Sequence, residues 1–390
     1  MSSITSYLPH DVDQALLVGR VWRTTADGEG PCVVVVRNGK VYDITRTAPT
    51  TADLLDSDDL LEIVRHAPGE LLGDASALLE QNLAGAAVAG APKLLAPCDV
   101  QAIKACGVTF AVSLLERVIE EQAGGDPAKA QSVRAEITQL IGTDLSRIKP
   151  GSDAALKLKD ELQRRGAWSQ YMEVGIGPDA EVFSKSQPMS AVGFGADIGL
   201  HPASAWNNPE PEIVLAVNGK GEVVGATLGN DVNLRDIEGR SALLLGKCKD
   251  NNGSCAIGPF IRLFDDAFTL DTVRGTSVSL RVEGADDDFL LEGVSHMKEI
   301  SRDPLDLVAQ TCGRHHQYPD GFMLFLGTMF SPIKDRDAPG GGFTHHLGDR
   351  VTISAAPLGA IVNTVRLCTE IEPWTFGVRA LYANLATRGL

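Results

Sequence analysis

Two glutamates near the middle of the chain have the type and the spacing that a divalent metal ion needs. Glu210 and Glu212 are separated by one proline and lead into residues 213–217, a short apolar run rich in β-branched and aliphatic residues. On an extended strand, residues two positions apart point to the same face. We therefore expect the two carboxylates to lie side by side at the start of a strand.

A third carboxylate follows beyond the next turn. Residues 218–221 (Asn-Gly-Lys-Gly) predict a hairpin turn, and residues 222–228 a return strand. Pairing across this turn brings Asp231 level with Glu210. Three converging carboxylates repel one another unless a cation lies among them, and oxygen-only ligand sets suit Mg²⁺ or Mn²⁺. The pattern predicts a metal site; an acidic hairpin edge that faces solvent is the structural alternative.

Composition limits the partners of this chain. Its 390 residues are 44% apolar and 22% charged, which is ordinary for a globular protein of one large or two smaller domains. A formal net charge of −16 argues against nucleic acids and anionic membranes as partners. It leaves anionic substrates open, because a bound cation and a few lysines reverse the local field. We expect a small-molecule substrate.

Targeting and redox signals are weak. The first residues do not show the charged-then-apolar pattern of a signal peptide, and no apolar run approaches about 20 residues. The seven cysteines are scattered without a C-x-x-C pair, which argues against disulfide scaffolds and zinc sites. The predicted location is cytoplasmic.

Local patterns predict two domains. Residues 15–22 and 32–36 are β-like, residues 51–64 and 69–83 are helical, and the Ala/Gly/Pro-rich residues 84–97 indicate a linker. We expect a small N-terminal α/β domain with its linker over residues 1–98 and a larger domain over residues 99–390.

The larger domain begins with a helical insertion. Residues 117–168 are charged and amphipathic: Asp126-Pro127 predicts one helix to about residue 141, Ser152 caps a second, and Gly166 stops it. A lid over a pocket and a dimer contact are both open as its role. From residue 171 onward, short strands and Gly-rich turns indicate a β-barrel or roll, with one helix near residues 303–313.

Several motifs now follow one another in the order of the fumarylacetoacetate hydrolase superfamily. Residues 107–116 (GVTFAVSLLE) resemble its G-x-N-Y-x-x-H-x-x-E segment, and Phe183-Ser184-Lys185 with Pro188 is similar to its F-x-K-P strand. Glu210-Pro211-Glu212 matches its E-x-E pair, and residues 230–236 (NDVNLRD) resemble N-D-V-(T/S)-x-R-D. Lys249-Asp250 with Gly258-Pro259, Gly327-Thr328 and residues 358–365 complete the set, which covers roughly residues 100–370.

The resemblance implies an α+β chain whose mixed β-roll catalytic domain binds a divalent metal, Mg²⁺ with Mn²⁺ as a second choice, and a 2-oxo acid. A 2-oxo acid chelates the metal through its carboxylate and keto oxygens, so the metal orients it and stabilises an enolate. The family's roles fall on the metal ligands Glu210, Glu212 and Asp231, the polarising lysine Lys249, the second basic contact Lys185 and the carboxylate-binding hydroxyl of Thr328.

One position departs from the family. The family's hydrolases activate water with the histidine of the first motif, and Ser113 stands in its place. A serine hydroxyl is not a base near neutral pH without a partner, whereas histidine is. Ser113 remains as a substrate-binding residue, and Glu116 remains as a single carboxylate for proton transfer. Hydrolysis of a C–C bond is therefore disfavoured.

The chemistry that survives is dehydration. One base and one electrophile suffice to remove a proton next to a metal-chelated ketone and to expel a β-hydroxyl group. Residues 206–259 look most like the family's 2-keto-3-deoxypentonate dehydratase branch, which makes 2,5-dioxopentanoate (α-ketoglutaric semialdehyde). The resemblance thus implies a magnesium-dependent hydro-lyase of pentose degradation, with Glu116 and Lys249 as catalytic residues, in a homodimer or homotetramer.

Two other interpretations stay open. An acylpyruvate hydrolase would need a replacement base, such as His201 or His346 hydrogen-bonded to Glu116. A regulatory protein with a structural metal would have a closed coordination shell and no adjoining cavity.

Overall fold

The computed structural model describes residues 7–84, 90–141, 148–164, 168–328, 330, 332, 334–339 and 341–390. Residues 85–89 of the predicted linker and the predicted helix stop at Gly166 lie outside the described residues.

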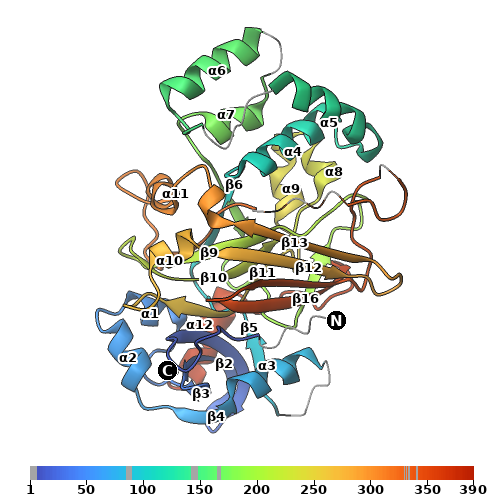
Figure 1. The fold of residues 1–390 in the computed structure, drawn as a ribbon. Coiled ribbons are helices and arrows are strands. Elements are labelled where there is room, and N and C mark those ends of the chain that lie inside the picture. Colours follow the sequence, from blue (N-terminus) through green and yellow to red (C-terminus); the bar gives the residue numbers. More distant parts are fainter. Residues whose placement is uncertain are drawn as a thin grey trace.

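The N-terminal part is a strand meander with short helices beside it (Figure 1). Its elements are β1 (Leu17–Thr25), β2 (Gly28–Arg37), β3 (Lys40–Asp43), α1 (Thr51–Asp56), α2 (Leu60–His66), β4 (Glu70–Asp74), α3 (Ala75–Leu83) and β5 (Lys93–Leu95). The helix expected over residues 69–83 is wrong in its first part. Gly73 has a φ of +128°, which no right-handed helix contains, and β4 pairs with β3 as an edge strand.

The remaining elements follow in chain order. After β6 (Ala102–Gly107) comes the helical segment, which comprises α4 (Ala111–Gln122), α5 (Pro127–Ile141), α6 (Asp153–Arg164) and α7 (Gln170–Ile176). The next elements are β7 (Glu181–Ser186), β8 (Asp197–Leu200), β9 (Pro211–Val217), β10 (Val223–Asp231), α8 (Arg235–Glu238), α9 (Leu245–Lys249) and β11 (Cys255–Leu263). The last are α10 (Leu270–Arg274), β12 (Ser277–Glu283), β13 (Leu290–His296), α11 (Pro304–Thr311), β14 (Phe322–Phe325), β15 (Arg350–Ala355), β16 (Gly359–Leu367) and α12 (Val378–Thr387). Short 3₁₀ turns lie at Ala242–Leu244, between α8 and α9, and at Met297–Glu299, after β13.

Two mixed sheets carry the fold. Among the described residues, the larger sheet has the order β4-β3-β2-β1-β11-β10-β9-β14-β6-β7, with β5 paired to β1. The smaller sheet has the order β13-β12-β15-β16-β8. The N-terminal strands therefore continue the larger sheet through the β1–β11 pairing, and the predicted domain boundary at residue 98 stays a prediction.

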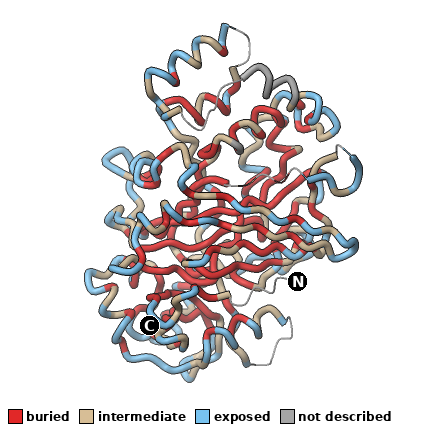
Figure 2. The backbone as a smooth tube through the Cα atoms, viewed as in Figure 1, coloured by how far each residue is buried: buried red, intermediate tan, exposed pale blue. Residues whose placement is uncertain are grey.

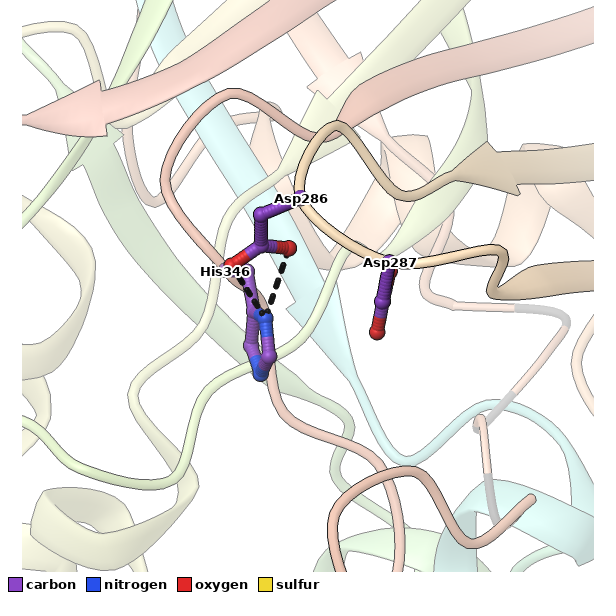
Figure 3. Close-up of side chains that lie close together, drawn as sticks. All are labelled: Asp286, Asp287 and His346. Carbon is purple, nitrogen blue, oxygen red and sulfur yellow. Dashed lines mark hydrogen bonds and ion pairs between the residues drawn. The ribbon is translucent and has the colours of Figure 1, made fainter.

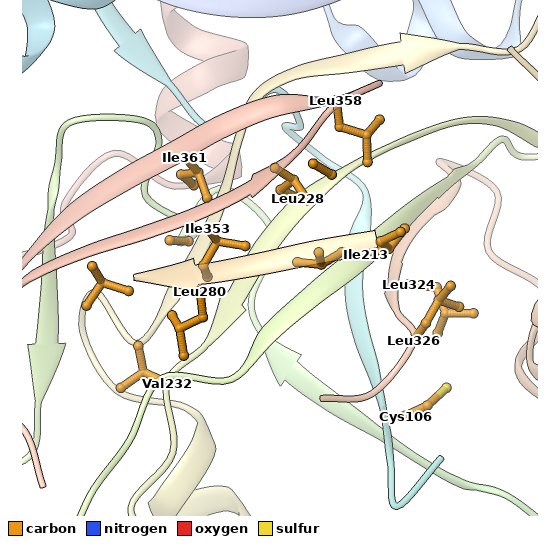
Figure 4. Packing of buried hydrophobic residues seen from close by; sticks show 14 of the residues in the cluster. Cys106, Ile213, Leu228, Val232, Leu280, Leu324, Leu326, Ile353, Leu358 and Ile361 are labelled. Carbon is orange, nitrogen blue, oxygen red and sulfur yellow. The ribbon is translucent and has the colours of Figure 1, made fainter. Parts of the chain in front are cut away.

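The main core lies between the two sheets. Ile213 and Leu228 of the larger sheet face Leu280, Ile353 and Ile361 of the smaller sheet (Figure 4). These side chains are almost completely buried. Because each strand alternates its side chains between two faces, a second cluster forms on the other face of the larger sheet, where α1 and α2 cover it. The structure is the mixed α+β fold that the sequence predicts.

Helices α4 to α7 stand at one end of the sheets with a small core of their own (Figure 1). That core includes Leu114, Val118, Ala155 and Met172, while the outer face of α6 is exposed (Figure 2). The helical segment begins at Ala111 rather than near residue 117. No helix within the described part of the chain is both long and apolar enough to cross a membrane.

The inter-sheet core predicts a large effect of one truncation. Leu228→Ala removes a fully buried side chain on β10, and we expect unfolding in urea to cost about 2–5 kcal/mol less than in the wild type. Leu243→Ala is the matched control, because Leu243 is 95% exposed and its truncation should change stability by no more than about 0.5 kcal/mol. Equal effects of the two substitutions would contradict this placement of the core.

Candidate active site

Strand directions bring the candidate residues to one edge of the larger sheet. β6 and β14 are parallel, so Gly107 at the end of β6 and Thr328 beyond β14 come to the same edge. β9 and β7 run antiparallel to these neighbours, so both strands start at this edge, with Glu212 near the start of β9 and Glu181 at the start of β7. Residues that are far apart in sequence thus meet without any long loop.

The hairpin of β9 and β10 places the three acidic residues as predicted. The amide of Asp231 donates to the carbonyl of Glu210 at 3.0 Å, which confirms that the two residues are level across the turn. Every residue of β9 is buried because the strand lies in the middle of the sheet. Glu210, Glu212 and Asp231 are each at most 2% exposed, and one carboxylate oxygen from each lies within 4.8 Å of the other two.

Three cationic side chains contact this triad. Lys249, the last residue of α9, donates to Glu210 at 2.5 Å and to Asp231 at 3.0 Å. Lys185 on β7 pairs with the other oxygen of Asp231 at 2.8 Å. Arg117 on α4 donates to Glu210. Glu212 receives only the amide of Gly327, at 2.7 Å, so it has no cationic partner among the described residues.

The pKa values of the triad reflect this unequal pairing. Burial raises the pKa of Glu212 well above its usual range, and the charges of Asp231 and Glu210 raise it further. Burial opposes ionisation of Asp231 too, but Lys185 and Lys249 outweigh it and lower its pKa. The ammonium of Lys249 is buried as well, yet the carboxylates of Asp231 and Glu210 raise its pKa well above the usual value. Glu212 is therefore the member of the triad that most lacks a positively charged partner.

An extended ion-pair network surrounds the triad. Arg117 contacts Glu120, Glu210 and Glu238, and Arg235 on α8 contacts Glu116 and Glu120. Within the described residues, this network and the cavity beside it contain seven carboxyl groups and five cationic groups: Glu116, Glu120, Glu181, Glu210, Glu212, Asp231 and Glu238, with Arg117, Arg134, Lys185, Arg235 and Lys249. When all are ionised, two negative charges lack a partner. A divalent cation supplies that charge, and an all-carboxylate ligand set suits a hard one.

A small cavity adjoins the triad. It has a volume of about 20 Å³, which is room for about one water molecule. The triad and Lys249 form one wall, and Ser113 and Thr328 also line it. The remaining lining consists of Cys106, Gly107, Val108, Arg117, Glu181, Phe183 and Glu238.

The structure does not favour Glu116 for proton transfer. Its carboxylate is not part of the cavity lining. Arg134 of α5 binds it at 3.2 and 2.5 Å, and Arg235 contacts it at 3.2 Å. Guanidinium groups thus engage both carboxylate oxygens of Glu116, and the catalytic role expected of it stays a prediction that its surroundings do not support.

The two histidines considered as replacement bases have other partners. His201 Nδ1 accepts from the amide of Ala203, and His346 Nδ1 and Nε2 contact Asp286 and Asp337. Among the described residues, Glu116 forms its ion pairs with Arg134 and Arg235 instead. The hydrogen bond that would revive a histidine–glutamate pair is thus not found here.

The three expected substrate contacts differ in their placement. Ser113 lines the cavity, and its hydroxyl donates to the carbonyl of Phe110. Thr328 lines it too, and donates to the carbonyl of Phe330. Lys185 is completely buried behind Asp231, and its three donors go to Asp231 and the carbonyls of Val232 and Lys249. Substrate contact by Lys185 stays a prediction, and this geometry favours a role in positioning Asp231.

Glu181 is a candidate that sequence reasoning missed. It lines the cavity, and burial, with the nearby charge of Glu238, raises its pKa to about 7. A carboxyl group of this kind exchanges protons near neutral pH. Strand alternation carried the signal, because Glu181, Phe183 and Lys185 occupy alternate positions of β7 and the last two belong to a recognised motif.

Sequence reasoning also missed Glu238 and Arg117 as residues of the site. Glu238 ends α8, three residues after Arg235, and Arg117 directly follows Glu116 in the first motif. Both line the cavity. Charge pairing between α4 and α8 could not be read from either segment by itself.

A second acidic group lies at the surface. Asp286 and Asp287, in the turn between β12 and β13, lie near His346, with Asp286 directed at its ring (Figure 3). Both ring nitrogens of His346 already contact carboxylates, and Arg336 binds Asp287 at 3.0 Å. This exposed cluster is balanced by its own ion pairs.

Comparison with known proteins finds a family model and relatives that match part of this chain. Residues 176–366 match the family model described as Fumarylacetoacetate (FAA) hydrolase C-terminal. The chain is 30% identical over 195 residues to the "Probable 2-keto-3-deoxyxylonate dehydratase" of Haloferax volcanii, a match that covers 50% of this chain and 63% of that protein. It is 29% identical over 198 residues to the "2-dehydro-3-deoxy-D-arabinonate dehydratase" of Saccharolobus solfataricus, covering 50% and 62%. The matches therefore span less than two thirds of either relative.

Solved structures show the shared fold. The apo form of a 2-keto-3-deoxy-D-arabinonate dehydratase superposes with a TM-score of 0.63 and 19% identity, covering 90% of this chain and 99% of that one. The same enzyme complexed with magnesium and 2,5-dioxopentanoate gives a TM-score of 0.62 with the same coverage. These likenesses confirm the fold class, and the family model confirms the resemblance over residues 176–366.

Loss of Glu212 should weaken metal binding strongly. In Glu212→Gln the triad loses the carboxylate that lacks a cationic partner, and we expect Mn²⁺ affinity, measured by calorimetry, to fall by more than the roughly 10–100-fold that loss of an outer partner costs. Glu299→Gln, at an exposed position outside the site, is the control. Unchanged affinity in Glu212→Gln would exclude the triad as the metal site.

The raised pKa of Glu181 predicts how its removal changes pH-dependent stability. Between about pH 4.5 and 7 the folded metal-free protein holds a proton that the unfolded chain releases, so this group's contribution to stability falls as pH rises through that window. Glu181→Gln cannot ionise, so it should be more stable than the wild type at pH 8 and similar at pH 4.5 in EDTA. Urea unfolding at both pH values measures the difference; a stability gain confined to pH 4.5 would contradict the assignment.

Proposed function

On the premise that residues 176–366 form a fumarylacetoacetate hydrolase C-terminal domain, we propose that this protein is a metal-dependent hydro-lyase that dehydrates a 2-keto-3-deoxy sugar acid. The substrate we propose is 2-keto-3-deoxy-D-pentonate, and the product is 2,5-dioxopentanoate. The observation that carries this proposal is the buried carboxylate triad, in which Glu212 has no cationic partner among the described residues, with Lys249 beside it at one cavity.

Two relatives support the reaction class. Both curated proteins that match half of this chain are named as dehydratases of 2-keto-3-deoxy pentonates. The related solved structure holds magnesium and 2,5-dioxopentanoate. Magnesium is accordingly the metal we assign to Glu210, Glu212 and Asp231, with Mn²⁺ as a functional substitute.

Lys249 is the residue we assign to the substrate's keto oxygen. Its ammonium lies at the cavity wall between Glu210 and Asp231. When bound, the metal would supply positive charge for the carboxylate and the keto oxygen of a 2-oxo acid. A metal at the triad compensates Glu210 and Asp231, which leaves the Lys249 ammonium free to donate a hydrogen bond to that oxygen.

Glu181 is the residue we assign to proton transfer, in place of Glu116. It takes a proton from C3, the electron pair of that C–H bond forms the C3–C4 double bond, and the C4–O bond breaks. The same carboxyl group returns its proton to the departing hydroxide, which leaves as water. The enone so formed, 5-hydroxy-2-oxopent-3-enoate, has the composition of 2,5-dioxopentanoate and becomes it by tautomerisation.

The cavity must open to admit a five-carbon acid, because its present volume holds about one water. The predicted lid role of the inserted helices fits this need. Arg134 of α5 already reaches Glu116 of α4, next to the cavity residue Arg117. A dimer contact stays the alternative role, and the homodimer or homotetramer and the cytoplasmic location stay predictions.

Hydrolysis of an acylpyruvate remains the second candidate function. Its support is that the matching family model is named for a hydrolase. Against it, Ser113 uses its hydroxyl in a hydrogen bond to a backbone carbonyl, and neither His201 nor His346 partners Glu116. The cavity beside the triad also disfavours a purely structural metal.

The direct test is an assay with purified protein. With 2-keto-3-deoxy-D-pentonate and Mg²⁺ we expect 2,5-dioxopentanoate to form, and EDTA to abolish its formation because the triad then loses its cation. Chromatography of the product against an authentic standard measures it. Release of pyruvate from an acylpyruvate, with no dehydration, would instead establish the hydrolase.

Two variants test whether Glu181 or Glu116 transfers the proton. Glu181→Gln should lower kcat by roughly 10²–10⁴-fold, the range that general acid–base groups contribute, while Mn²⁺ affinity stays near the wild-type value. Glu116→Gln should keep kcat within about tenfold, because its carboxylate lies in an ion pair and outside the cavity lining. The reverse order of effects would return the proton-transfer role to Glu116.

A further inference from the structure

Glu238 is a buried carboxylate that the reaction described above does not use. It is 4% exposed, it ends α8, and it lines the same cavity as the triad. Its Oε2 lies 2.9 Å from Arg117 Nη1, yet this buried oxygen has no hydrogen-bond donor among the described residues. Buried polar atoms in native proteins are rarely left in this state, and one beside a cavity indicates a donor that a ligand brings.

Arg117 positions the carboxylate of Glu238. One of its terminal nitrogens contacts Glu238 and the other binds the metal-ligand candidate Glu210. The guanidinium group of Arg117 thus bridges the carboxylates of Glu238 and Glu210. Arg117 is itself held by Glu120, which also binds Arg235, so Glu238 has a defined position relative to the triad.

An ionised carboxylate only accepts hydrogen bonds. The ligand group that satisfies Glu238 is therefore a donor, and a sugar acid offers hydroxyl groups. A substrate whose 2-oxo acid end lies at the triad presents its other end to the rest of the cavity. After loss of the C4 hydroxyl, the C5 hydroxyl is the one that remains for recognition.

We propose, on the premise of the dehydration above, that Glu238 is the specificity-determining residue that accepts a hydrogen bond from the C5 hydroxyl of the substrate. It selects hydroxylated 2-oxo acids over apolar ones, because an analogue without that hydroxyl leaves a buried carboxylate oxygen without a hydrogen-bond donor. Acylpyruvates, which carry an alkyl group there, are excluded by the same group.

The test compares two substrates with a series of variants. The substrates are 2-keto-3-deoxy-D-pentonate and 4-hydroxy-2-oxopentanoate, which lacks only the C5 hydroxyl. In the wild type with Mg²⁺ we expect kcat/KM for the first to exceed that for the second by roughly 10–100-fold, the value of a hydrogen bond to a charged group. Glu238→Leu removes the acceptor and should bring this ratio close to one, through loss of activity on the hydroxylated substrate alone. Glu238→Gln keeps one acceptor oxygen and should retain part of the ratio.

Controls separate this role from a structural one. Glu299→Gln, exposed and outside the site, should leave the ratio unchanged. Mn²⁺ affinity and the unfolding midpoint of Glu238→Leu show whether the triad and the fold persist. Equal loss on both substrates, or an unchanged ratio, overturns the role of Glu238 while the dehydratase stands. A wild type that dehydrates neither substrate overturns the proposed function, and the specificity role with it.

Discussion

The central physical constraint in this protein is that three carboxylates are buried at the end of one hairpin. Moving an ionised carboxylate from water into the interior costs several kcal/mol unless an opposite charge lies beside it. Lys249, Lys185 and Arg117 supply part of that charge, and Glu212 is left with one backbone amide. A divalent cation completes the compensation, and the network of α4, α8 and α9 can be understood as the scaffold that holds these charges in place.

The sheet explains why such a cluster is possible. Parallel β6 and β14 and the antiparallel strands β9 and β7 bring their ends to one edge, and β9 and β14 are buried along their whole length. The helices above this edge then contribute the charged groups that the strands lack. Arg117 from α4 and Glu238 from α8 form an ion pair at the cavity, so the helices place charged groups beside the triad.

Much of this was predictable from local patterns. The E-x-E pair, the Asn-Gly turn and Asp231 predicted the hairpin and its register, because strand alternation and turn chemistry are local properties. The fate of Glu116 was not predictable, since Arg134 and Arg235 come from segments 18 and 119 residues away. Glu181 was predictable in principle from its alternation with Lys185 on β7. The strand at residues 70–74 was missed because pairing with β3 and one glycine conformation overrode a helical pattern.

The most direct measurement is anomalous diffraction from crystals grown with MnCl₂ and soaked with pyruvate, an unreactive 2-oxo acid. We predict one strong peak among the carboxylates of Glu210, Glu212 and Asp231, with the pyruvate oxygens beside it and the Lys249 ammonium turned from Glu210 toward the keto oxygen. A triad without a peak, still closed by the Lys249 contacts seen here, would contradict the account.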